Sequence, residues 1–431
     1  MSPALLAFAV ALLPVVDGTR IPVLRALLKN VHVPFVGPPP KAKAQLLAAA
    51  SDLIRDLNIE VSSKVSIKWL GTERGVGVLA QAPIEDGELL LRGPVSPVSV
   101  VGATSQAPWE SEGIHTLAHH VVEDAPSSFP GTARVLVKLT NLLLHIGRHN
   151  VSTLGPMERY IAALPLARQE LLAYWPEDAR ALLRGSTVLT RVPAQDKRTL
   201  QYAAGLLSFW PPDSPKPSLE EMHDAWVRAN ILTDTRVHHP AIIGPMFIPV
   251  LDLVNHAPLE ASNADYKFHP SGSHWHVRSS KSIAPGEEVQ LCYCGWDFLT
   301  MWERAGFFDR TNVHDAIVQI HVAPGAIAEG HAGGVYALPR EHALWGEGEG
   351  AVLIKELLES APRELGLEDA RRHAEIRLAE LIRAHLSGYA APPAPPAPGV
   401  EDPLAEYRVV AENVLNFERS LLNRILDSLH A

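Results

Sequence analysis

Apolar residues follow a helical period in some parts of the chain and form short strand-like runs in others. Residues 44–57 carry apolar side chains three or four positions apart, the spacing of a helix that buries one face. Three β-branched runs follow, separated by turns rich in glycine and proline. They predict a small β-meander with strands at residues 64–70, 76–81 and 88–91.

The pattern changes again further along the chain. Residues 114–230 are rich in Leu, Ala and Arg, with helical spacing at 133–146, 157–164 and 178–183. Strand-like runs return at 246–254, 264–268, 274–278 and 288–293. Beyond residue 316 apolar stripes predict helices, and a Pro/Ala tract predicts a loop at 390–398. The order is therefore β, then helical, then β, then helical.

Composition is that of a globular protein, with 431 residues, 47% apolar and 20% charged. The formal net charge of −10 argues against a nucleic-acid partner, whose electrostatic footprint would be basic. The two cysteines, Cys292 and Cys294, lie two apart on one expected strand, where a bridge is geometrically poor. A zinc site would need further ligands, which His238, His239 or His256 could supply; we expect no metal.

The N-terminal segment could be a targeting sequence or an N-terminal extension of the domain that follows. Residues 5–13 are apolar over the length of a signal-peptide core, but no Lys or Arg precedes them. Residues 17–50 hold five basic residues and one acid, which fits an organellar presequence or a partly ordered extension. The compartment, organellar (plastid) or cytoplasmic, stays open. No later segment is apolar over the length that a membrane span needs, so no membrane partner is expected.

A glycine pair near the N-terminal strands is the first candidate site. In the run from Arg74 to Val78, Gly75 and Gly77 could be turn glycines of a hairpin, one at positive φ. Alternatively, the missing side chains let a ligand approach the backbone. The run is not a dinucleotide fingerprint, because a strand and not a helix follows.

Polar residues at the ends of apolar runs are the next candidates. Asn255 and His256 follow the run from Phe247, with Asp252 three residues before Asn255. Tyr293 is the last residue of the strand-like run at 288–293. Each has an ordinary structural reading, as a turn cap or a core residue. Buried amide and imidazole groups nevertheless need hydrogen-bond partners, so the pair is unusual. Arg236, after an amphipathic helix, would alone be read as a solvated arginine.

Taken in order and spacing, these motifs resemble one family, over roughly residues 60 to 430. The chain is similar to the SET-domain protein methyltransferases of the Rubisco large-subunit lysine methyltransferase type. Arg74–Val78 resembles its first cofactor motif, Asp252–His256 its Asp-x-x-Asn-His, and Tyr293 its catalytic tyrosine. Gly306 and Phe307 resemble the Gly-Phe beside the adenine. Three positions depart from the pattern: Thr235 stands for the usual Ser, Cys294 for Gly and Phe298 for Asn.

The resemblance implies an α+β fold: a SET-domain β-fold of short sheets, interrupted by a large helical insert and followed by an all-α C-terminal domain. The implied parts are an N-terminal extension or targeting segment (1–43), the first SET half (44–113), the insert (114–235), the second SET half (236–312) and a helical substrate-binding domain (316–431).

The implied activity is transfer of a methyl group from S-adenosylmethionine to a protein lysine, by a chain expected to be a monomer. Tyr293 would be catalytic. The cofactor would be held by Arg74, Gly75, Gly77, Arg236, Asn255, His256 and Phe307. Two alternatives stay open: a protein-histidine methyltransferase, and an inactive SET-like module that binds a protein.

Overall fold

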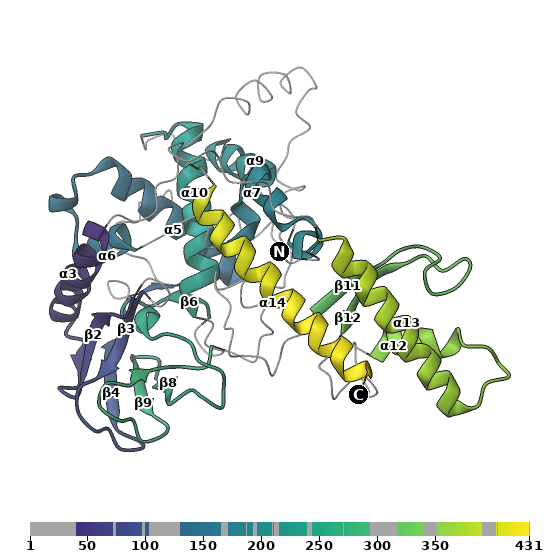
Figure 1. Ribbon diagram of the computed structural model, residues 1–431. Coiled ribbons are helices and arrows are strands. Elements are labelled where there is room, and N and C mark those ends of the chain that lie inside the picture. Colours follow the sequence, from purple (N-terminus) through teal and green to yellow (C-terminus); the bar gives the residue numbers. More distant parts are fainter. Residues whose placement is uncertain are drawn as a thin grey trace. The chain divides into compact units, whose positions relative to one another are not determined.

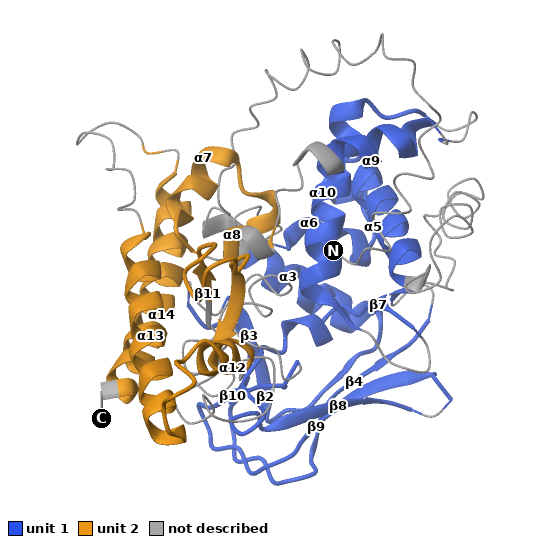
Figure 2. Ribbon diagram, turned by 90° about the vertical axis from the view of Figure 1, so that its right-hand side faces the viewer, with its two compact units in different colours: residues 1–168, 196–294 blue, residues 169–195, 295–431 orange. Residues whose placement is uncertain are grey.

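Short antiparallel strands and longer helices make up the computed structural model (Figure 1). It describes residues 40–71, 75–96, 100–102, 130–164, 171–186, 188–192, 196–208, 210, 215–238, 244–269, 271–293, 318–338, 351–389, 402 and 404–430. The chain divides into two units (Figure 2). Unit 1 comprises residues 1–168 and 196–294, and unit 2 comprises residues 169–195 and 295–431.

Unit 1 contains five helices and ten strands among the described residues. The helices are α3 (Pro40–Asp56), α5 (Pro130–Arg148), α6 (Pro156–Ala163), α9 (Asp196–Ser208) and α10 (Leu219–Arg236), with short 3₁₀ turns η1 (Val151–Thr153) and η5 (Leu251–Leu253). The strands are β1 (Glu60–Val61), β2 (Val65–Trp69), β3 (Val76–Ala80), β4 (Leu89–Pro94), β5 (Val101–Gly102), β6 (Val237–His238), β7 (Met246–Phe247), β8 (Ala264–Phe268), β9 (His274–Ser279) and β10 (Glu288–Val289).

These strands form three small sheets, in the orders β1-β4-β9-β8, β10-β3-β2 and β5-β7-β6. β3 is central in its sheet, and its Val78 is fully buried between β2 and the distant β10. The three strands predicted at 64–70, 76–81 and 88–91 are present. The prediction that they form one β-meander is wrong, because β4 pairs with β1 and β9 instead of β3. The turn after β3, where Ile84 pairs with Ile283, carries the chain into the second sheet.

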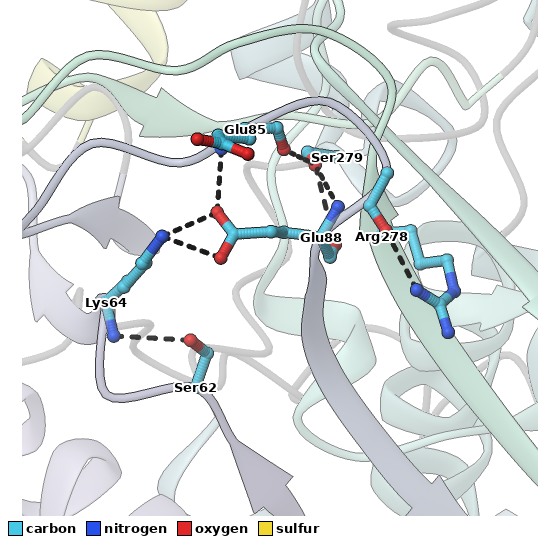
Figure 3. A network of polar contacts seen from close by, with 7 residues as sticks. Ser62, Lys64, Glu85, Glu88, Arg278 and Ser279 are labelled. Atoms are coloured by element: carbon cyan, nitrogen blue, oxygen red, sulfur yellow. Dashed lines mark hydrogen bonds and ion pairs between the residues drawn. The ribbon is translucent and has the colours of Figure 1, made fainter.

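A polar network fixes that turn (Figure 3). The Glu88 carboxylate accepts from Lys64 Nζ at 2.6 and 2.8 Å and from the Glu85 N–H at 2.7 Å. Ser279 Oγ in turn accepts from the Glu88 N–H at 2.9 Å and donates to the Glu85 carbonyl. The Lys64 ammonium and the Glu85 N–H both hold the pKa of Glu88 below its usual range. β2, β4 and β9 are thereby joined at one turn.

Helix α10 positions Arg236, a candidate site residue, at its C-terminal end. It starts with a capping box in which Ser218 and Glu221 each accept from the other's backbone N–H. Its buried face, which includes Trp226 and Leu232, packs against α5. It ends at Arg236, directly before β6. Arg236 is therefore held where a buried helix meets a strand.

Two expected strands are shorter than the sequence indicated. The run at 246–254 is a strand only over Met246–Phe247, and the run at 288–293 only over Glu288–Val289. The first run is buried throughout, and the second is buried at Glu288, Val289 and Leu291. Pro249 lacks the N–H that a strand ladder needs, and Val250 has φ of 71°, so the first run turns instead of extending.

Unit 2 is mainly helical, as expected beyond residue 316. Its elements are η3 (Leu172–Tyr174), α7 (Glu177–Arg180), η4 (Ala181–Leu183), α8 (Val188–Arg191), β11 (Val318–Val322), β12 (Gly334–Leu338), α12 (Ala351–Glu359), α13 (Leu367–Ser387) and α14 (Ala405–His430). The β11–β12 pair was not expected from the sequence. It packs with α12, α13 and the segment from Leu172 to Val192 around one core.

A buried carboxylate joins three segments of unit 2. Glu418 in α14 is 0% exposed and accepts from Ser186 Oγ at 2.9 Å and Tyr389 Oη at 3.1 Å. Burial raises the pKa of Glu418 to about 7, and the two hydroxyls oppose that rise. Glu418 therefore binds a proton more tightly in the folded chain than in the unfolded one.

We expect unit 2 to lose stability as the pH rises. A folded-state pKa above the ordinary 4.5 gives stability that is complete below pH 4.5 and lost as the pH rises through about 7. Between pH 5.5 and 8 the loss should be about 2 kcal/mol, from about 1.4 kcal/mol per pH unit. Urea unfolding of the wild type and Glu418→Gln, which cannot ionise, measures it. Equal pH dependence in both proteins would refute this role of Glu418.

No helix among the described residues has the length and apolarity of a membrane span.

Candidate active site

The turn after β7 is the centre of the candidate site. Val250, fully buried, has φ of 71° and ψ of −41°, a conformation that a β-branched residue rarely adopts. The Asp252 N–H donates to the Ile248 carbonyl at 3.2 Å, and η5 then leads to Asn255. Such a backbone costs on the order of 1–3 kcal/mol and persists only where its surroundings hold it.

Asp252 is held from two sides. Tyr160 Oη, from α6, donates to Asp252 Oδ1 at 2.6 Å, and Arg236 Nη1 donates to Oδ2 at 3.0 Å and to the Asp252 carbonyl at 3.3 Å. The Asp252 side chain is 0% exposed. Burial raises the pKa of Asp252, while the Arg236 guanidinium and the Tyr160 hydroxyl oppose that rise.

Asn255 links the turn to the other two segments of the site. Its Nδ2 donates to the Val76 carbonyl of β3 at 3.3 Å and to Glu288 Oε1 of β10 at 2.7 Å. Glu288 is 8% exposed, so its carboxylate is a buried acid at the middle of the site. Sequence reasoning missed Glu288; the available signal was an acid at the first position of a short strand.

Gly77 is where β3 comes closest to these two side chains. A Cβ on Gly77 would lie 2.8 Å from both Asn255 Nδ2 and Glu288 Oε1. Gly75, at φ of 64°, instead makes the turn before β3, and its N–H donates to the Gly71 carbonyl at 2.9 Å. Gly75 thus serves the turn, whereas Gly77 allows the Asn255 and Glu288 side chains to approach β3 closely.

Tyr293 and His256 come together from segments that run side by side. Leu291 N–H donates to the Asn255 carbonyl and Ala257 N–H to the Leu291 carbonyl, each at 2.9 Å. This pairing brings the Tyr293 N–H to His256 Nδ1 at 3.0 Å, with ring centroids 5.2 Å apart. His256 Nδ1 is therefore an acceptor, so a neutral His256 carries its proton on Nε2.

The Tyr293 hydroxyl donates to the Val254 carbonyl at 2.8 Å. Burial raises the pKa of Tyr293 above its ordinary value; Arg236 opposes that rise, and Asp252 and Glu288 add to it. At neutral pH this side chain is a protonated phenol, which can donate a hydrogen bond and cannot act as a base.

Six of the eight site residues suggested by the sequence are described, and the contacts above bring them to one region of unit 1: Gly75, Gly77, Arg236, Asn255, His256 and Tyr293. Arg74 and Phe307 lie outside the described residues. The described part holds no group of three or more His, Cys, Asp or Glu side chains suited to a metal ion.

Comparison with known proteins places this arrangement in context. No family model matches the chain. The curated N-lysine methyltransferase SETD6 from Mus musculus is 23% identical over 294 residues, which cover 64% of this chain. The match spans 58% of the mouse protein, less than two thirds of its length.

Solved structures match over most of the chain. The SET domain of LSMT bound to lysine and AdoHcy covers 90% of this chain and 91% of its own, with a TM-score of 0.54 at 13% identity. Rubisco LSMT bound to AdoMet covers 89% and 91%, with a TM-score of 0.55 at 16% identity. The SET domain of LSMT bound to methyllysine and AdoHcy covers 89% and 91%, with a TM-score of 0.56 at 15% identity.

The agreement extends through the sheets of unit 1 and the helical C-terminal region. The chain has the SET-domain fold of the Rubisco LSMT structures.

Proposed function

We propose that this chain is an S-adenosylmethionine-dependent protein-lysine N-methyltransferase. The observation that carries the proposal is the meeting of Tyr293, Asn255 and Gly77 at one turn, within a fold whose solved examples bind AdoMet, AdoHcy and lysine. The mouse relative, an N-lysine methyltransferase, supports the same activity.

The residues present fit the proposed cofactor. S-adenosylmethionine carries a sulfonium, an ammonium and a carboxylate, and the site offers two buried acids, Asp252 and Glu288, and one arginine, Arg236. Gly77 leaves no room for a side chain, because a Cβ there would lie 2.8 Å from Asn255 Nδ2 and from Glu288 Oε1. We propose that Gly75, Gly77, Asn255 and His256 hold the cofactor and that Arg236 binds its carboxylate. By resemblance to the SET-domain family, Arg74 would belong to the first cofactor motif and Phe307 would lie beside the adenine. When bound, the sulfonium would make the methyl group electrophilic.

The role of Tyr293 follows from its protonation state. A lysine amine of pKa about 10.4 must lose its proton before it attacks, which at pH 7 costs about 4.6 kcal/mol. A neutral phenol does not take that proton. We propose that Tyr293 lowers the barrier by holding the amine in line with the methyl group.

We also propose that the helices of unit 2 beyond residue 316 bind the protein substrate.

We expect kcat/KM to rise with pH as the acceptor amine loses its proton. The slope should be about one log unit per pH unit between pH 7 and 9, because the amine sets it. Tyr293 should add no falling limb in that range, since its pKa is raised above the ordinary value of 10. Initial rates at saturating cofactor test this. A rate that levels off above about pH 6.5 would indicate a histidine acceptor instead.

The direct test uses the full chain, S-adenosylmethionine and an array of cell proteins, read by mass spectrometry of methylated sites. We expect methyl groups on lysine. Methylated histidine would favour the alternative acceptor. No cofactor binding by calorimetry would favour an inactive binding module.

A further inference from the structure

Two buried side chains, Tyr160 and Asp252, and the partly buried Arg236 meet at the turn that ends at Asn255. Tyr160 is 0% exposed, and its hydroxyl lies 2.6 Å from Asp252 Oδ1, on the opposite carboxylate oxygen from Arg236. Asp252 and Arg236 belong to the segments that carry the candidate site, whereas Tyr160 lies in α6, at residues 156–163. A helix that is 92 positions away in the sequence therefore contacts this turn through the Tyr160 hydroxyl.

The Tyr160 hydroxyl binds two points of the turn. It donates to the Asp252 carboxylate and accepts from the Val250 N–H at 3.3 Å. Val250 is the residue at φ of 71°, and its N–H would otherwise be a buried donor in a strained backbone. One hydroxyl thus satisfies the strained residue and fixes the acid two positions later.

The same turn sets the geometry of the catalytic tyrosine. Val254, two residues after Asp252, provides the carbonyl that accepts from Tyr293 Oη at 2.8 Å. Asn255 follows and reaches Val76 and Glu288. A shift of the turn would move the hydroxyl acceptor and the Asn255 amide together.

We propose that Tyr160 is a positioning residue that acts through Asp252 on the turn from Val250 to Asn255, and so orients the Tyr293 hydroxyl for methyl transfer. The proposal rests on the proposed function for its catalytic part only. Tyr160 would not touch the cofactor or the acceptor amine.

The test is Tyr160→Phe, which removes one oxygen and keeps the ring beside Phe247, whose centroid lies 6.4 Å away. We expect kcat to fall by about 10- to 100-fold, the scale of a small misplacement of reacting groups. KM for the protein should stay within about threefold, and Kd for S-adenosylmethionine should rise by less than kcat falls, because Asn255 keeps its own bonds to Val76 and Glu288. The matched control is Tyr202→Phe, a buried tyrosine of unit 1 that packs on Trp226, and it should keep the wild-type kcat.

A double-mutant cycle separates positioning from a general structural role. If Tyr160 acts through Asp252, then Tyr160→Phe should cost little further kcat in an Asp252→Ala background, which leaves no carboxylate oxygen for the hydroxyl to bond, because coupled sites are not additive. Additive losses would show that the two residues act independently and would overturn the proposal. If Tyr160→Phe does not fold, Asp252→Asn alone must lower kcat by a larger factor than it raises the cofactor Kd, or the proposal fails.

Hydrogen exchange gives a readout that does not depend on activity. The amides of 250–257 and 291–293 should exchange faster in Tyr160→Phe than in the wild type or Tyr202→Phe. If the wild type transfers no methyl group, the proposed function fails and exchange alone decides whether Tyr160 holds the turn. Unchanged exchange, or faster exchange with wild-type kcat in an active enzyme, would overturn the positioning role.

Discussion

Tyr293→Phe should lower kcat by about 10²–10³-fold, the scale seen when one preorganised donor is removed from a reaction site. The variant loses the hydroxyl that donates to the Val254 carbonyl and keeps the ring that lies 5.2 Å from His256. The His256 contact uses the Tyr293 backbone N–H and is unaffected by the change. The fold and the cofactor Kd should therefore change by no more than a few-fold.

Single-turnover methyl transfer and calorimetry with S-adenosylmethionine measure the two quantities separately. Tyr202→Phe, which removes a hydroxyl elsewhere in unit 1, is the matched control and should keep the wild-type rate. A wild-type rate in Tyr293→Phe would show that another group orients the amine.

Gly77→Ala should weaken cofactor binding and destabilise unit 1. The added Cβ would lie 2.4 Å from Leu70 Cδ1 and 2.8 Å from Asn255 Nδ2 and Glu288 Oε1, so the amide and the acid must move. Overpacking of this kind costs about 1–3 kcal/mol of stability. Loss of one or two hydrogen bonds by Asn255 would lower cofactor affinity by about 10- to 100-fold.

The control for this change is Gly147→Ala in α5, where an added Cβ meets nothing within 4 Å. It should leave cofactor affinity unchanged and raise stability by up to about 1 kcal/mol, because alanine favours a helix over glycine. Urea unfolding and calorimetry compare both variants. Wild-type affinity in Gly77→Ala would contradict the place of Gly77 in the cofactor site.

Helical periodicity anticipated the long elements well. The expected helix at 44–57 is α3, and the stripe at 410–429 lies within α14, because a long amphipathic face repeats its signal over several turns. Two-residue strands such as β7 and β10 carry no such repeat. The β11–β12 pair was also not predicted, because a five-residue strand gives too short a run of alternating apolar and polar residues to distinguish it from a helix.

The prediction of a strand over 246–254 was wrong beyond Phe247, because it rested on apolar character alone. The segment is buried as expected, but burial does not specify extended backbone. What decides its shape is Pro249, the positive φ of Val250 and the hydrogen bonds from Tyr160, whose hydroxyl lies about ninety residues away in the sequence. Only the folded chain shows that contact.

The candidate site was accessible from sequence because its residues stand at the ends of apolar runs. Asn255, His256 and Tyr293 stood out in that way, and their roles came from the resemblance to the SET-domain family; the structure places His256 and Tyr293 in contact, next to Asn255. The ion pair of Arg236 with Asp252, and the Glu288 carboxylate on Asn255, could not be read from spacing. Those contacts join segments separated by 16 and 33 positions and depend on how the sheets pair.

The most direct measurement of the central claim follows an isotope-labelled methyl group from S-adenosylmethionine. Full-length wild type and Tyr293→Phe are incubated with the labelled cofactor and cell protein, and the modified residues are mapped by mass spectrometry. We expect labelled methyl groups on lysine side chains in the wild type, reduced by at least about 10²-fold in Tyr293→Phe. No labelled lysine in the wild type, or equal labelling by both proteins, would contradict it.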